Sequence, residues 1–103
     1  MVIGVVSNNE NYIDIAKGLM DSGYQVMSIC DTNIMRDPEV HKRSMLHKAS
    51  LCNVLIADPD SKCDSFTDAI VQQAVFNHQI VILDNMKNAE ETVAHVRKEI
   101  IHA

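Results

Sequence analysis

Short apolar runs alternate with amphipathic stretches along the whole chain. Four runs are rich in β-branched and other apolar residues and end at polar or turn-forming residues, which is typical of buried strands. They predict strands over residues 2–6, 24–30, 52–57 and 80–83. After the first, third and fourth runs, apolar side chains recur at intervals of three and four residues, which predicts a helix in each of these segments.

Local signals mark the ends of these helices. Asp37 followed by Pro38 predicts the start of the second helix, which runs to about Ala49, because Asp accepts hydrogen bonds from free backbone amides and Pro fits the first helical position. Gly23 stands where a left-handed residue would end the first helix. The other helix starts are expected at Asn9 or Asn11, near Ser65 with Asp68 three residues on, and at Asn88 with Glu91 three residues on.

The same spacing predicts which helical residues face the core. The expected inner faces are Tyr12, Ile15, Ala16, Leu19 and Met20 in the first helix, Phe66, Ala69, Ile70, Ala74 and Phe76 in the third, and Val93, Val96, Ile100 and Ile101 in the last. Met27, Met45, Cys30 and Cys52 are also expected to fill space in the core.

Strands that alternate with helices predict right-handed crossovers and a parallel sheet. The 103 residues, 47% of them hydrophobic, are enough for one core and too few for two. The sequence therefore predicts a single α/β domain over residues 1–103. It is a small doubly wound, flavodoxin-like domain of three layers, with four parallel strands in the order 2-1-3-4.

Charge and composition limit the possible partners and locations. The 14 acidic residues outnumber the 9 Lys and Arg, giving a net charge of -5, and this excess repels nucleic acid. No apolar run approaches the roughly 20 residues of a membrane span, and the N-terminal apolar run is interpreted as a strand rather than a signal peptide. Three cysteines without a CxxC pair suit a reducing compartment, so we expect a cytoplasmic protein. Histidine spacings of six and seven residues predict no metal site, and no cofactor is expected.

The strand order places a candidate ligand site. In an open parallel sheet, ligands bind at the carboxyl ends of the strands where the order reverses, here between the first and third strands. The side chains expected there are Ser7, Asn8 and Asn9 after the first strand and Asp58, Asp60 and Ser61 after the third, with Asp31 and Asp84 on the flanks. This rim is polar and acidic.

The segment 49–83 carries a family resemblance. The stretch ASLCNVLIADPDS at 49–61, followed by a helix and by HQIVIL at 78–83, resembles the nucleoside 2-deoxyribosyltransferases. The resemblance implies a nucleoside ligand and N-glycosidic chemistry. Counting back from Ile80, the family's nucleophilic glutamate falls on Ile70, and the nearest carboxylates are Asp64 and Asp68. Asp68 is either a displaced nucleophile or an acid that stabilises the helix dipole.

Two functions follow from these observations. The first is a small nucleoside- or nucleotide-binding domain with degenerate N-glycosidic chemistry, and whether it is an enzyme stays open. The second is a non-catalytic interaction or regulatory domain on the same scaffold. We expect a homodimer in either case, because a four-stranded sheet leaves an exposed edge and the last helix has apolar surface at Ala94 and Ile100.

Overall fold

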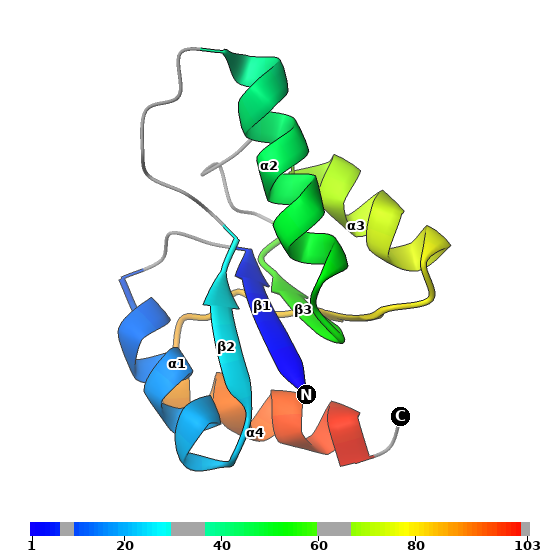
Figure 1. Cartoon of the computed structure of the whole chain (residues 1–103). Helices are drawn as coiled ribbons and strands as arrows, with labels where there is room; N and C mark the ends of the chain where they lie inside the picture. The colour runs from blue at the N-terminus through cyan, green and yellow to red at the C-terminus, as the bar shows by residue number, and fades with distance from the viewer. Residues whose placement is uncertain (7–9, 30–36, 60–66, 102–103) are drawn as a thin grey trace.

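Four parallel strands form one sheet in the order β2-β1-β3-β4 in the computed structural model, as predicted (Figure 1). The structure describes residues 1–6, 10–29, 37–59 and 67–101. Along the chain the elements are β1 (Val2–Val6), α1 (Tyr12–Asp21), β2 (Gln25–Ser28), α2 (Pro38–Ser50), β3 (Val54–Ala57), α3 (Thr67–Phe76), β4 (Ile80–Leu83) and α4 (Ala89–Ile101). Strands β2 and β3 are shorter than predicted, because each is limited to the residues that pair with β1.

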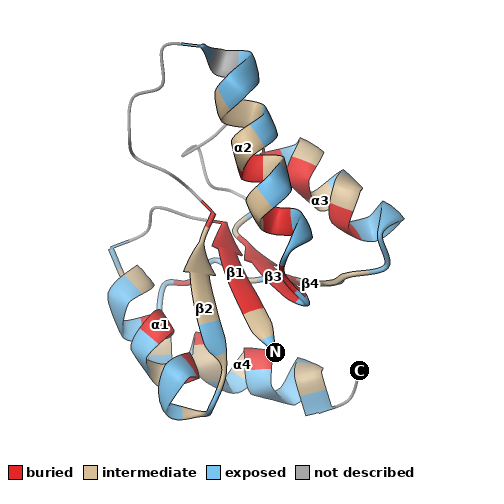
Figure 2. Cartoon of the chain, viewed as in Figure 1, coloured by how far each residue is buried: buried red, intermediate tan, exposed pale blue. Residues whose placement is uncertain are grey.

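Helices cover both faces of the sheet, so the fold is the three-layer, doubly wound arrangement expected. Helices α1 and α4 lie on one face, and α2 and α3 lie on the other (Figure 1). Because side chains alternate along a strand, Ile3 and Val5 join the core under α1 and α4, whereas Val6 joins the core under α2 and α3. Figure 2 shows the consequence: the central strands β1 and β3 are largely buried and the edge strands are less so.

Three of the predicted helix ends are confirmed. Gly23 has φ +93° and ends α1 in a Schellman motif, in which its amide donates to the Met20 carbonyl and the Tyr24 amide donates to Leu19. The Asp37 carboxylate accepts a 3.0 Å hydrogen bond from the Glu39 amide at the start of α2. Asn88 accepts one of 3.1 Å from the Glu91 amide. These signals act over a few residues, so they can be read without knowing the tertiary structure.

Several predictions about individual side chains are wrong. Asn11, one of the two caps expected for α1, begins the helix but makes no side-chain cap; its amide instead donates to the carbonyls of Met86 and Lys87, each at 3.0 Å. Asn9, the other expected cap, lies outside the described residues. Met20, Phe76 and Ile101, expected in the core, are respectively 54%, 83% and 72% exposed, because each lies at a margin of its helix that no described element covers. Met27 is half-buried, Ile70, Ala74 and Met45 are buried as expected, and Cys30 and Phe66 lie outside the described residues.

None of the helices in the described ranges combines the length and the hydrophobicity that a membrane span requires.

Candidate functional site

A pocket of about 310 Å³ opens where β3 and β4 end and α3 begins. We call it the α3 pocket. Its lining comprises Ala57, Pro59, Thr67, Asp68, Val71, Gln72 and Leu83. The volume is at the lower end of the range typical of small-molecule sites. The position is the carboxyl edge of the sheet, one strand away from the predicted order reversal between β1 and β3.

Helix α3 supplies the polar side chains of the pocket. Asp68 lies in the first turn and Gln72 one turn later, so both stand on the same side of the helix, and both are exposed. Thr67 is 8% exposed and Val71 is half-buried. Leu83, at the end of β4, is 55% exposed although it is a large apolar residue. The pocket therefore combines an apolar wall with a carboxylate and a carboxamide.

The charge of the lining favours a neutral ligand. Asp68 is the one ionisable side chain among the described lining residues, and no Lys, Arg or His belongs to that set. A carboxylate accepts hydrogen bonds from hydroxyl groups, and a carboxamide can both donate and accept. A phosphate group placed beside Asp68 would meet like-charge repulsion. The arrangement suits a hydroxylated, partly planar ligand without a phosphate.

The structure places only part of the predicted ligand set. Ser7, Asn8, Asn9, Asp60 and Ser61 lie outside the described residues, as do Asp31 and Asp64. Asp58 follows β3 directly and is half-buried, between the lining residues Ala57 and Pro59 but not itself in the lining. Of the predicted candidates that the structure describes, Asp68 is the one that lines the α3 pocket.

Ile70, the residue on which the resemblance would place a nucleophilic glutamate, lies on α3 and is fully buried in the core between the sheet and the helices α2 and α3. A carboxylate at this position would be in the core and out of reach of a ligand. Asp68, two residues earlier, lies on the pocket side of α3. The accessible carboxylate, Asp68, is therefore not at the position that the resemblance implies for the nucleophile, which is Ile70.

A second polar cluster, which the sequence did not predict, lies at the end of β4. The Asp84 carboxylate accepts hydrogen bonds from the Met86 amide at 2.7 Å, Thr92 Oγ1 at 3.0 Å and His95 Nδ1 at 2.8 Å. Because a carboxylate without a proton can only accept, Nδ1 of His95 carries the hydrogen. The other ring nitrogen, Nε2, lies 3.7 Å from a Glu99 carboxylate oxygen. The one sequence signal for this cluster is the spacing of Thr92 and His95 by three residues on α4.

The Asp84 cluster holds a strained loop. Met86 has φ +55° and is fully buried in the core under α1 and α4, a backbone conformation that a non-glycine residue adopts only at a cost. Burial raises the pKa of Asp84, but the hydrogen bonds from His95, Met86 and Thr92 and the charge of His95 outweigh it, so the pKa lies below its ordinary value. Neither Asp84 nor His95 lines a described pocket, and we assign the cluster a structural role.

The described residues provide neither a metal centre nor a reactive thiol. No group of three or more His, Cys, Asp and Glu side chains in these ranges could hold a metal ion. Cys52 is buried, its thiol donates to the Lys48 carbonyl at 3.5 Å, and burial raises its pKa, which disfavours the thiolate.

Comparison with protein-family models, curated proteins and solved structures gives no match for this chain.

Proposed function

We propose that this chain is a nucleoside-binding domain and that the α3 pocket is its ligand site. The observation that carries the proposal is the pairing of Asp68 with Gln72, one helical turn apart, beside the apolar side chains Val71 and Leu83. A nucleoside has the complementary parts: sugar hydroxyls for the carboxylate, polar base edges for the carboxamide and a flat apolar face for the wall. The resemblance of residues 49–83 to nucleoside 2-deoxyribosyltransferases supports the same ligand class.

A nucleoside fits this pocket better than a nucleotide. The net charge of the chain is -5 and the ionisable lining residue is acidic. A phosphate would have to overcome both the general negative field and the local repulsion from Asp68. We therefore propose that the ligand binds without its phosphate.

Binding of a nucleoside does not require that the pocket also cleaves it, and the carboxylates of the chain decide between the two. N-glycosidic transfer requires a carboxylate that reaches the anomeric carbon, and Ile70, the residue on which the resemblance would place that carboxylate, is a buried apolar residue. Asp68 is the accessible carboxylate of the pocket. We propose that its role is to hold a sugar hydroxyl, so that the domain binds nucleosides without cleaving them.

The test is calorimetric titration and thermal denaturation with thymidine, deoxyadenosine and thymidine 5′-monophosphate. A ligand that binds only the folded state raises Tm, and we expect both nucleosides to do so more than the monophosphate. Asp68→Asn should weaken nucleoside binding about tenfold or more, the loss expected for a hydrogen bond to a charged group. Gln72→Ala should weaken it less. Asp21→Asn, which removes an exposed acid outside the pocket, is the matched control.

The proposal fails if no nucleoside changes Tm, or if nucleosides bind and both pocket variants bind them as well as the wild-type chain. A chromatographic assay for free thymine, run on the same samples, addresses catalysis. We expect no release of the base. Release that Asp68→Asn abolishes would instead assign Asp68 as the nucleophile.

A further inference from the structure

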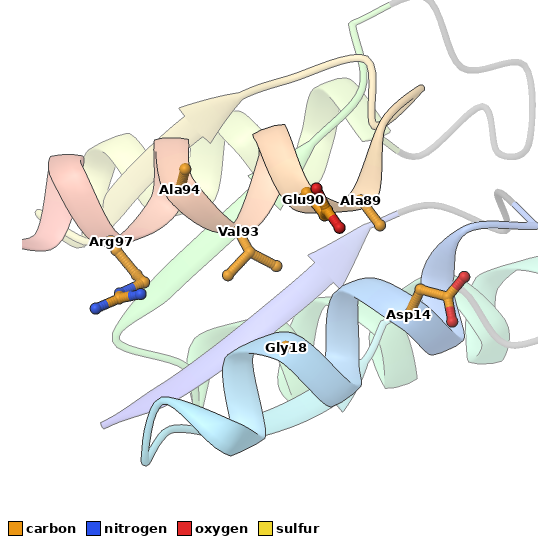
Figure 3. Close-up of a pocket in the computed structure, with 7 residues that line it drawn as sticks. All are labelled: Asp14, Gly18, Ala89, Glu90, Val93, Ala94 and Arg97. Carbon is orange, nitrogen blue, oxygen red and sulfur yellow. The ribbon is translucent and has the colours of Figure 1, made fainter.

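A groove of about 390 Å³ lies between α1 and α4, on the opposite face of the sheet from α3 (Figures 1 and 3). Small and apolar residues form its middle, among them Gly18 and Val93. Its charges are separated: Asp14 and Glu90 lie toward one end, and Arg97 lies toward the other (Figure 3). No ion pair within the described chain involves these three side chains.

Helix α4 presents one continuous exposed stripe beside the groove. Glu90, Ala94, Arg97 and Ile101 follow one another at intervals of four, three and four residues, which places them on one face of the helix. All four are exposed, and Ile101 is 72% exposed. The stripe thus has an acid at its start, a small residue near its middle, and a base and a large apolar residue toward its end.

We propose that this groove and stripe, which we call the α1–α4 face, form the contact between two copies of the chain related by a two-fold axis. The point midway between Glu90 and Arg97 falls between Val93 and Ala94. A two-fold axis through that point runs the two α4 helices antiparallel. It sets Glu90 of each copy against Arg97 of the other, and it brings the small Ala94 side chains close to the axis.

The charge pattern is what selects a second copy as the occupant. A two-fold interface uses the same patch on both subunits, so each patch must complement itself when reversed, and an acid and a base at equal distances from the axis meet that condition. Exposed ion pairs add little affinity but fix register and orientation. The apolar middle of the groove supplies the surface whose burial stabilises the contact. The inference does not depend on the nucleoside proposal.

The test measures the oligomeric state by sedimentation equilibrium from micromolar to millimolar protein, with charge-reversed variants. Glu90→Arg and Arg97→Glu each replace two attractions in the dimer by two repulsions and should weaken dimerisation about tenfold or more. The double variant restores the pairing with the charges exchanged and should regain most of the affinity. Within one helix these positions are about 10 Å apart along the axis, so rescue would require contact between copies.

Glu91→Arg is the matched control, since it makes the same change in charge in the same helical turn but on a different side of α4. It should dimerise like the wild-type chain, and circular dichroism should show that every variant is folded. A wild-type chain that stays monomeric throughout the range, a dimer that Glu90→Arg leaves unchanged, or a double variant no better than the single ones would each overturn the proposal.

Discussion

Removing the Asp84 carboxylate should release the strained Met86 loop and the start of α4. Asp84→Ala leaves three donors without their acceptor: the Met86 amide, the His95 imidazole and the hydroxyl of Thr92. Thr92 is 1% exposed, so water replaces its lost partner poorly. Counting about 1 kcal/mol for each bond, since the carboxylate is partly exposed and the bonds are not independent, the variant should lose about 3 kcal/mol of unfolding free energy.

Asp84→Asn is the milder test of the same cluster. Its remaining oxygen can still accept hydrogen bonds from the Met86 amide and from Thr92, but the negative charge and one acceptor facing His95 are lost. We expect a loss of about 1 kcal/mol. Asn85→Ala is the control, because Asn85 makes a comparable turn hydrogen bond of 3.1 Å to the Lys87 amide at an exposed position. Its effect should stay within about 0.5 kcal/mol.

The difference in unfolding free energy between the wild-type chain and Asp84→Asn should depend on pH, in a direction set by the pKa of Asp84. The pKa of Asp84 is lower in the folded chain than its ordinary value of 3.8. The charged carboxylate therefore stabilises the fold fully above about pH 4, and this contribution is lost as the pH falls through the folded pKa. The gap between the wild-type chain and Asp84→Asn should shrink below about pH 4.

Urea denaturation followed by circular dichroism measures all three variants at neutral and acidic pH. A loss of about 3 kcal/mol corresponds to a fall in Tm of roughly 10–20 °C for a domain of this size. The reasoning is refuted if Asp84→Ala is no less stable than Asn85→Ala, or if the gap between the wild-type chain and Asp84→Asn persists unchanged in acid.

Two further predictions concern single positions in the fold. Asp37→Ala removes the side-chain cap on the Glu39 amide and should lower the unfolding free energy by about 1 kcal/mol; an unchanged urea midpoint would contradict this. In Gly4→Ala the new Cβ would lie 2.7 Å from a Leu55 methyl carbon and 2.8 Å from the Cys52 sulfur, so we expect a loss of about 1–3 kcal/mol from overpacking. Gly23→Ala is the comparison: no atom lies within 4 Å of the new Cβ, so the loss of stability comes from the backbone φ of +93° alone. An unchanged Tm for Gly4→Ala would contradict this expectation, because it would show that Leu55 and Cys52 move aside at no cost in stability.

The sequence predicted the elements because their signals are local. Apolar runs located all four strands, and Gly23, Asp37 and Asn88 marked helix ends through hydrogen bonds that span two to five residues. Helical spacing also fixed which residues share a face. It could not fix where a covered face ends: Phe76 falls at the end of α3, and Ile101 falls on the uncovered margin of α4.

The sites were harder to predict because they depend on contacts between distant segments. Asn11 was one of two residues expected to cap its own helix, but its side chain holds a loop 75 residues further along the chain. Met86 lies in a polar stretch that gives no sign of a buried residue, and the left-handed backbone that buries it is held by Asp84. The pocket residue Asp68 was singled out because it lies near the position where the family resemblance implies a nucleophilic glutamate, whereas the roles of Gln72 and Leu83 required the packing of α3 beside β4.

Consecutive residues at the end of β4 point to opposite faces of the sheet, one of which carries the α3 pocket and the other the α1–α4 face. Side chains alternate along this strand: Val81 packs with the core under α2 and α3, and Ile82 packs with the core under α1 and α4. The alternation continues into Leu83, which lines the α3 pocket, and Asp84, which binds His95 on α4. A dimer formed through the α1–α4 face therefore leaves the α3 pocket open, because α3 covers the opposite side of the sheet (Figure 1). The backbone step from Leu83 to Asp84 joins the two faces at this edge of the sheet, and the Asp84 side chain is held there by hydrogen bonds from Met86, Thr92 and His95.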